Sequence, residues 1–295
     1  MSAKIIDGKA VAAAVKKELA TKVAAMIDAD QKAPHLAAML VGNDPASETY
    51  VASKERACRE VGMTSSTYRM PANVSEKELL DTIAFLNEDT EVDGFIVQLP
   101  LPSHIDEKKV IEAILPAKDV DGFHPMNIGR LQTGLPAYLP ATPYGVVELL
   151  KRSNISVEGK HCVVLGRSNI VGTPLSMLLS RKNEYGNATV TICHSRTPNL
   201  SDFTLQADVL IAAIGQAEFV KAAMVKSDAV VVDVGIHRIE DASNPKGYRI
   251  VGDVAYEEVL KKASWITPVP GGVGPMTIVS LLLNTLAACE KKYYI

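Results

Sequence analysis

The fold class follows from one stretch of the sequence, His161-Cys162-Val163-Val164-Leu165-Gly166-Arg167-Ser168-Asn169-Ile170-Val171-Gly172. Its apolar first half predicts a buried strand that ends at Gly166, and the residues after Gly172 predict a helix. A strand, a tight glycine turn and a helix N-terminus together form the arrangement that holds the pyrophosphate of a dinucleotide. The spacing is Gly-x-Ser-x-x-x-Gly rather than Gly-x-Gly-x-x-Gly, so an ordinary strand-to-helix turn explains the bare pattern equally well.

The composition is that of a globular protein with room for two domains. The chain has 295 residues, of which 47% are hydrophobic and 22% are charged, and its net charge is −3. This charge gives no reason to expect nucleic acid or an anionic membrane as a partner. The apolar stretch at 278–289 is too short to span a bilayer, and the N-terminus lacks the apolar core of a signal peptide. The cysteines have no paired spacing and the histidines have no metal-ligand spacing, so we expect a cytoplasmic protein with no metal.

Predicted strands and helices alternate along the chain, which indicates parallel βαβ construction. The strands expected before the opening stretch lie at 36–41, 64–69 and 94–99. The Val- and Ile-rich strands expected after it lie at 188–193, 208–214, 229–234 and 265–267. Between the two groups, the Pro- and Gly-rich residues 133–143 are typical of a hinge.

We therefore predict an α/β protein of two domains with a cleft between them. The first domain comprises residues 1–141 with 276–295, and the second, residues 142–275, is Rossmann-like and doubly wound. The first is discontinuous because a final helix at 278–291 is apolar on most faces and needs a groove to cover it. Residues 268–277 are too rich in Pro and Gly to form regular structure.

The strand ends of the second domain indicate which cofactor binds there. An NAD site places Asp or Glu at the end of the second strand, where it binds the ribose hydroxyl. This chain instead has Ser195 and Arg196 there, with Arg167 in the preceding turn and Gly215 at the end of a later strand. A hydroxyl and guanidinium groups suit the additional phosphate of NADP, so NADP is favoured over NAD. The alternative is that Arg196 is only a solvated surface charge.

Four residues of the first domain are candidates for the chemistry. Tyr50 and Lys54 are four apart on a predicted helix and project from one face, Gln98 ends a strand, and Asp121 follows in a loop. Three of them have a purely structural alternative: Lys54 as a solvated lysine, Gln98 as a glutamine that satisfies a loop, and Asp121 as part of an Asp-Gly turn. Spacing alone does not decide between these interpretations.

Five blocks in order resemble the bifunctional methylenetetrahydrofolate dehydrogenase/cyclohydrolase family: Tyr50-Val51-Ala52-Ser53-Lys54, Val97-Gln98-Leu99-Pro100-Leu101-Pro102, Lys118-Asp119-Val120-Asp121-Gly122, residues 166–172, and Pro268-Val269-Pro270-Gly271-Gly272-Val273-Gly274-Pro275-Met276-Thr277. The resemblance implies two reactions of one-carbon metabolism, which supplies purine synthesis. NADP takes a hydride from 5,10-methylenetetrahydrofolate, and water then opens the methenyl product to 10-formyltetrahydrofolate. It also implies tetrahydrofolate derivatives as ligands and a homodimer.

The resemblance assigns roles residue by residue. Lys54 transfers the proton in the hydrolysis, Gln98 orients Lys54, Tyr50 positions the reacting carbon, and Asp121 binds the pterin. The other residues implied to border the folate are Leu99, Pro270, Gly271 and Gly272. The residues implied to hold the cofactor are Gly166, Arg167, Ser168, Ser195, Arg196 and Gly215, with Ile236 and Thr277 near the nicotinamide.

Two rival interpretations stay open on the sequence. One is another two-domain NADP oxidoreductase, such as an enzyme resembling shikimate dehydrogenase, which also uses a lysine. The other is a catalytically silent nucleotide-sensing module, against which the presence of Lys54 argues. The polar segment at 181–187 is a surface excursion longer than the connection usual in the family.

Overall fold

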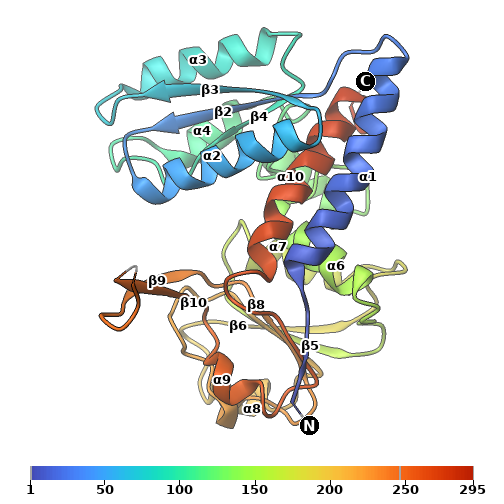
Figure 1. The fold of residues 1–295 in the computed structure, drawn as a ribbon, viewed down its shortest axis with the longest axis vertical. Helices are drawn as coiled ribbons and strands as arrows, with labels where there is room; N and C mark the ends of the chain where they lie inside the picture. The colour runs from blue at the N-terminus through green and yellow to red at the C-terminus, as the bar shows by residue number, and fades with distance from the viewer. Residues whose placement is uncertain (1, 246, 295) are drawn as a thin grey trace. The chain divides into compact units, whose positions relative to one another are not determined.

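The computed structural model describes residues 2–245 and 247–294. Contacts between residues divide the chain into two units, each coloured by chain position in Figure 1. Unit 1 comprises Met1–Ala12 and Thr142–Thr277, and unit 2 comprises Ala13–Ala141 and Ile278–Ile295. This division differs from the predicted boundaries near the N-terminus, where strand β1 (Lys4–Ile5) pairs with a strand of unit 1.

Unit 1 contains a parallel sheet of six strands in the order β1-β11-β8-β7-β5-β6. Its further strands are β5 (His161–Leu165), β6 (Thr189–Cys193), β7 (Val209–Ala212), β8 (Val230–Asp233) and β11 (Trp265–Ile266). All five pairings between neighbours are parallel. The chain leaves β5 toward β6 on one side and continues with β7 on the other, so the sheet is doubly wound with its switch point at β5. Ligands of such sheets bind at the carboxyl ends of the strands beside the switch point.

The burial of the central strands explains why they could be predicted from the sequence. Strands β5, β7 and β8 are almost wholly buried runs of Val, Leu, Ile and Ala, as expected where helices and loops cover both faces. The helical segments of unit 1 are α6 (Ala141–Arg152), α7 (Gly172–Ser180), α8 (Leu200–Thr204), α9 (Tyr256–Val259) and a 3-10 turn at Ala222–Met224. An antiparallel hairpin, β9 (His237–Glu240) and β10 (Tyr248–Val251), was not predicted. Its strands bury few side chains and therefore carry little apolar signal.

Unit 2 is built on a parallel three-stranded sheet with β2 (His35–Val41) between β3 (Thr64–Met70) and β4 (Gly94–Val97). The central strand is buried along almost its whole length. Helices α3 (Glu76–Glu88) and α4 (Glu107–Ala113) pack on the face that presents Ala37, Met39 and Val41. The other helices with residues in this unit are α1 (Gly8–Asp28), α2 (Pro45–Glu60), α5 (Pro125–Gln132) and α10 (Val273–Cys289).

The start of α10 corrects one prediction. Residues 268–277 were expected to be irregular throughout, but the helix begins at Val273. Pro275 lies in its first turn, where a backbone N–H has no partner within the helix and its loss costs nothing. The irregular part of the Pro- and Gly-rich segment therefore ends before Val273.

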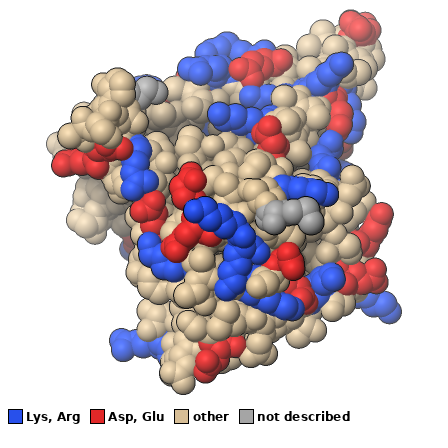
Figure 2. All heavy atoms as spheres, turned by 60° about the horizontal axis from the view of Figure 1, so that its bottom comes forward, with Lys and Arg blue, Asp and Glu red and all other residues tan. Residues whose placement is uncertain are grey.

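The surface of one face is drawn in Figure 2, where acidic and basic side chains are interspersed rather than gathered by sign. Among the described residues, no helix combines the length and the hydropathy that crossing a membrane requires.

Candidate functional site

Helix α2 positions the two residues that were predicted from its spacing. Asp44 caps its N-terminus by accepting the N–H of Ser47 at 2.8 Å, and Pro45 occupies its first turn. One turn apart on this helix, Tyr50 remains 38% exposed while Lys54 is only 9% exposed. The solvated-lysine alternative is therefore wrong for Lys54.

The amine of Lys54 is held by the end of strand β4. Its Nζ donates a hydrogen bond to Oε1 of Gln98 at 3.0 Å, and Nε2 of Gln98 donates to the carbonyl of Leu99 at 2.7 Å. The second bond fixes which way the amide of Gln98 faces, so its oxygen is presented to the lysine. The structure thus brings together Lys54 and Gln98, which are 44 residues apart in sequence.

Asp121 supplies the opposing charge. Burial lowers the pKa of Lys54, and the carboxylate of Asp121 acts in the opposite direction on that pKa. Reciprocally, burial raises the pKa of Asp121 while the charge of Lys54 lowers it. Two oppositely charged groups whose pKa values are shifted by burial and by each other's charge are typical of a catalytic site.

The glycine turn of unit 1 is closely packed at both of its glycines. Gly166 has a φ of +117°, and a Cβ there would lie 2.1 Å from the carbonyl oxygen of Ala213. A Cβ on Gly172 would lie 2.1 Å from the carbonyl oxygen of Gly166. No side chain fits at either position, so the first turn of α7 lies directly against the end of β5. Such an uncovered backbone fits the close approach of a pyrophosphate.

Ser168 determines which backbone N–H groups of this turn remain available to bind a ligand. Its Oγ accepts the N–H groups of Val171 at 3.2 Å and Gly172 at 3.4 Å, and its carbonyl accepts that of Thr173 at 3.1 Å. The first N–H groups of α7 are therefore engaged within the turn, contrary to the simple picture of a free helix N-terminus. Within the described ranges, the N–H groups of residues 167–170 have no acceptor in the protein.

The end of β6 lies beside this turn. Leu165 pairs with Cys193, and the N–H of Gly166 donates to the carbonyl of Cys193 at 2.8 Å. The following turn is closed by Thr197, whose Oγ1 accepts the N–H of His194 at 2.9 Å. In this turn Ser195 and Arg196 are exposed, at the same edge of the sheet as Arg167. The structure thus brings the predicted phosphate ligands to neighbouring strand ends.

A buried carboxylate that the sequence did not reveal organises the loop after β7. Asp253 is fully buried, and its oxygens accept the N–H groups of Ile214, Gly215 and Gln216 at 2.7, 3.1 and 2.9 Å. It also bonds Nε2 of His237 at 2.8 Å. One side chain therefore fixes the loop that carries Gly215 and anchors the hairpin that begins at His237.

A second carboxylate supports the first. Asp233 ends β8 and accepts the N–H groups of Gly235 and Asp253, and burial raises its pKa to about 6. The only signal for it in the sequence is its position at the end of a Val-rich strand, which indicates a strand end but no role for the carboxylate.

The remaining predicted residues of unit 1 lie on two segments. Ile236 is 52% exposed after β8, and Thr277 on α10 shares a hydrogen bond with Thr142 at 3.0 Å. Gly271 accepts the N–H of Lys9 through its carbonyl at 3.1 Å. Gly271 and Gly272 are buried, and the peptide bond between Val269 and Pro270, just before them, is cis. The roles of Ile236 and Thr277 toward the nicotinamide and of residues 270–272 toward folate stay predictions.

Comparison with known proteins decides the family. Residues 6–121 match the model of the tetrahydrofolate dehydrogenase/cyclohydrolase catalytic domain, and residues 140–293 match that of its NAD(P)-binding domain. The bifunctional protein FolD of Porphyromonas gingivalis is 58% identical over 290 residues, which cover 98% of each chain. The chain belongs to the tetrahydrofolate dehydrogenase/cyclohydrolase family.

Solved structures of this family have the same fold as this chain. The bifunctional FolD of Campylobacter jejuni has a TM-score of 0.92 and 47% identity, and the match covers 99% of this chain and 100% of that one. The FolD of Trypanosoma brucei, complexed with NADP cofactor and inhibitor, has a TM-score of 0.93 and 39% identity, with 99% of each chain covered. The shikimate dehydrogenase of Thermus thermophilus, at 16% identity and a TM-score of 0.54, resembles this chain in fold alone.

These comparisons confirm the family, the two-domain α/β fold and the enzymatic function that were predicted. As a member of the tetrahydrofolate dehydrogenase/cyclohydrolase family, the chain oxidises 5,10-methylenetetrahydrofolate with a nicotinamide dinucleotide and hydrolyses the methenyl product to 10-formyltetrahydrofolate. The rival interpretation as a shikimate-dehydrogenase-like enzyme is not supported.

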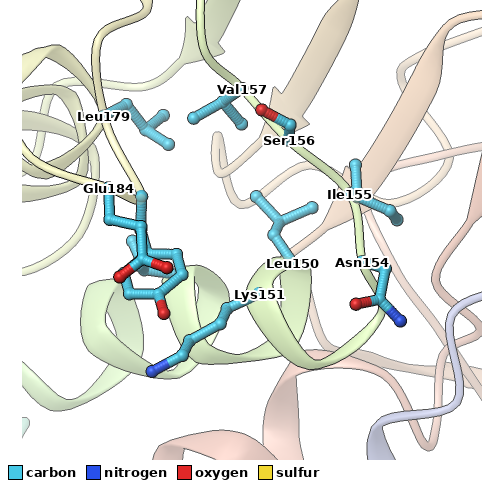
Figure 3. A pocket seen from close by; sticks show the side chains of 10 residues that line it. Leu150, Lys151, Asn154, Ile155, Ser156, Val157, Leu179 and Glu184 are labelled. Carbon is cyan, nitrogen blue, oxygen red and sulfur yellow. The ribbon is translucent and has the colours of Figure 1, made fainter.

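Unit 1 of this family member also has a pocket of about 260 Å³ that includes none of the predicted site residues. Figure 3 shows the side chains that line it, which are a mixture of apolar and polar groups. Its lining residues are Val147, Leu150, Lys151, Asn154, Ile155, Ser156, Val157, Leu179, Glu184 and Tyr185. The excursion at 181–187 forms one wall, where Nζ of Lys151 lies 4.2 Å from the ring centroid of Tyr185. In the described part of the chain, no three acidic, His or Cys side chains are arranged to hold a metal.

Replacing Gly166 tests the close packing of the turn. In Gly166→Ala the new Cβ meets the carbonyl of Ala213 and the backbone is strained, so we expect binding of NADP to weaken by roughly tenfold or more. Calorimetric titration of NADP measures the dissociation constant directly. The matched control is Gly159→Ala, where φ is +67° but no atom lies within 4 Å of the added Cβ. That variant should unfold slightly more easily and bind NADP normally. Equal binding by both variants would contradict the assignment.

Proposed function

We propose that Lys54 is the residue that transfers protons in the cyclohydrolase reaction, and that Asp121 binds the pterin beside it. The observation that carries this proposal is the burial of the Lys54 amine. This amine donates a hydrogen bond to Gln98, and burial lowers its pKa. A lysine acts as a base near neutral pH only when its surroundings favour the neutral amine. Burial supplies that condition, and a cationic bound substrate acts in the same direction.

The hydrolysis follows from this arrangement. Water adds to the amidinium-like carbon of the methenyl substrate, and the neutral amine of Lys54 accepts the proton that the water loses. The resulting ammonium then donates a proton to the ring nitrogen as the carbon–nitrogen bond breaks. The hydroxyl of the adduct gives its remaining proton to the amine, and from there to solvent, as it becomes the formyl carbonyl, so one proton is released overall. Gln98 accepts a hydrogen bond from the lysine in both states, so the amine keeps its place through the two transfers. Tyr50, which lies one turn earlier on α2 and is 38% exposed, positions the reacting carbon.

The dehydrogenase step depends on positioning more than on acid–base chemistry, because the folate nitrogens stabilise the cation that forms. When bound, the dinucleotide supplies the hydride acceptor. Its pyrophosphate fits the turn from Gly166 to Gly172, where residues 167–170 offer N–H groups. The hydroxyl hydrogen of Ser168 also remains available, because Oγ uses only its lone pairs on Val171 and Gly172.

We propose NADP rather than NAD as the preferred dinucleotide. Arg167, Ser195 and Arg196 are exposed at adjoining strand ends, and the end of β6 has no carboxylate to bind a ribose hydroxyl. Arginine is the side chain best suited to bind a phosphate through two parallel hydrogen bonds. The other residues proposed to bind the cofactor are Gly215, Ile236 and Thr277. The residues proposed to border the folate are Leu99, Pro270, Gly271 and Gly272.

A homodimer and a cytoplasmic location also stay predictions. Sedimentation tests the first and cell fractionation tests the second.

Removing the amine separates the two activities. Lys54→Met should reduce hydrolysis of methenyltetrahydrofolate by at least about a hundredfold, because general acid–base catalysis contributes that much. The same variant should retain measurable dehydrogenase activity, since hydride transfer needs no proton acceptor. Absorbance of the methenyl substrate and of NADPH follows the two rates. Lys22→Met, which removes an exposed lysine of α1, serves as the control. A full cyclohydrolase rate in Lys54→Met would refute the assignment.

Introducing a negative charge at position 98 should shift the pH dependence of the hydrolysis rate. The neutral amine is the active form, so the rate rises with pH through the lowered pKa of Lys54. Gln98→Glu places a carboxylate on the ammonium and stabilises it, which raises that pKa. The rising limb should therefore move to higher pH by roughly one to three pH units. Gln132→Glu adds the same charge at an exposed position of unit 2 and should leave the limb in place. An unchanged limb in Gln98→Glu would exclude Lys54 as its source.

The preference for NADP should depend on Arg196. Arg196→Ala should raise the KM for NADP by roughly tenfold or more and change the KM for NAD little, because only NADP carries the second phosphate. Steady-state kinetics with both dinucleotides measures the ratio. Lys182→Ala, which removes an exposed charge elsewhere in unit 1, controls for net charge. Equal effects on both dinucleotides would remove Arg196 from the phosphate site.

A further inference from the structure

The loop that carries Asp121 is held by two buried polar side chains that have no place in the proposed chemistry. Asp119 is 2% exposed, and Asn284 on α10 is 3% exposed. Buried polar groups of this kind are costly unless fully hydrogen-bonded, so each has a definite set of partners. In both cases the partners are backbone or amide groups around Asp121.

The carboxylate of Asp119 gathers the residues that follow Asp121. Its oxygens accept the N–H of Phe123 at 3.2 Å and that of His124 at 2.8 Å. Its carbonyl accepts the N–H of Gly122 at 3.1 Å. The chain therefore folds around Asp119, and Asp121 lies within the turn that these bonds close.

The amide of Asn284 fixes the same turn from another element. Its Nδ2 donates to the carbonyl of Val120 at 2.8 Å and to that of Leu139 at 2.9 Å. The carbonyl of Asp121 accepts the N–H of Ala141 at 3.2 Å. Gly122 has a φ of +74°, and a Cβ there would lie 2.6 Å from the backbone of Leu139. The backbone on both sides of Asp121 is thus held against residues 139–141.

Asn127 completes the support of Asp119. It is fully buried, and its Nδ2 donates to Asp119 at 2.8 Å. Its Oδ1 accepts the hydroxyl of Tyr294 at 2.7 Å, which fixes the orientation of the amide. Asp119 therefore receives three N–H donors, all of which favour its ionised form.

Burial makes Asp119 titratable in the neutral range. Burial raises its pKa to about 7, the three N–H donors lower it, and the charge of Asp121 raises it further. The other titratable groups that face it are Tyr138 and Tyr294, whose pKa values its charge raises, together with the ring of His124 in the adjoining turn. Those two tyrosines remain neutral throughout the neutral range.

We propose that Asp119 and Asn284 are positioning residues that hold the carboxylate of Asp121 for the pterin and thereby set the affinity for folate. This inference rests on the proposed pterin-binding role of Asp121. Asp119 and Asn284 act through the loop and touch no reacting atom.

The experiment is calorimetric titration of the full chain with tetrahydrofolate. Asp121→Asn is the reference variant and should weaken binding by roughly tenfold or more. Asp119→Asn replaces one acceptor oxygen by an amide that cannot accept, so it should also weaken binding by roughly tenfold. Asn284→Ser, which shortens the donor, is the second variant and should act in the same direction. Asp106→Asn alters an exposed carboxylate that caps α4 by accepting the N–H of Lys108 and should leave binding unchanged.

The pH dependence separates positioning from a general loss of structure. In the unaltered chain, the dissociation constant of tetrahydrofolate should fall as pH rises through about 7, where Asp119 ionises and accepts its three bonds fully. Asp119→Asn should lack this step, and Asp106→Asn should keep it. A merely structural role for Asp119 would not remove a step from the profile.

The outcomes are distinct. If Asp121→Asn binds tetrahydrofolate normally, the proposed role of Asp121 fails. If Asp121→Asn weakens binding but Asp119→Asn and Asn284→Ser bind normally, the positioning inference alone is overturned. If either positioning variant does not fold, as judged by circular dichroism, the unaltered chain decides, because the absence of a binding step between pH 6 and 8 overturns the inference.

Discussion

The burial of one amine is the constraint on which the rest of unit 2 depends. An isolated ammonium is expensive to remove from water, and the protein compensates Lys54 with one amide oxygen and one nearby carboxylate rather than with a close ion pair. A close ion pair would raise the pKa of the amine and keep it protonated, so no neutral amine would be present to accept a proton. The hydrogen bond to Gln98 keeps the amine in place without fixing its charge, which is the compromise that a proton-transferring lysine requires.

Both units contain buried carboxylates that accept hydrogen bonds from several backbone N–H groups. In unit 2 Asp119 closes the turn of Asp121, and in unit 1 Asp253 holds three consecutive N–H groups of the loop at 214–216. Loops are ordinarily the mobile part of an α/β protein, because their backbone groups bond to water. A carboxylate that accepts several of those groups at once restrains the loop. Ligand-binding residues on such loops are then held in place before the ligand arrives.

The sequence predicted the sheet well and the contacts between distant side chains poorly. Strands β5, β7 and β8 are buried on both faces, so their continuous apolar runs identify them without further information. The hairpin of β9 and β10 was missed because its exposed strands lack that signal. The roles of Lys54 and Gln98 came from the family resemblance, since no local pattern indicates a hydrogen bond across 44 residues. Asp253 was missed for a related reason, because its partners become neighbours only when the sheet forms.

The irregular glycine motif is explained by contacts rather than by spacing. In the common fingerprint, the second glycine lets the backbone approach the pyrophosphate and the third lets helix and strand pack closely. Here Gly172 provides the close packing, because its Cα lies against the carbonyl of Gly166. Ser168 takes the middle position and turns its hydroxyl oxygen onto the N–H groups of Val171 and Gly172. The longer turn thereby satisfies the first N–H groups of its own helix, while among the described residues the N–H groups of residues 167–170 have no protein acceptor. A motif that departs from the fingerprint in spacing thus preserves its two physical requirements, a bare backbone and donors free to bind an anion.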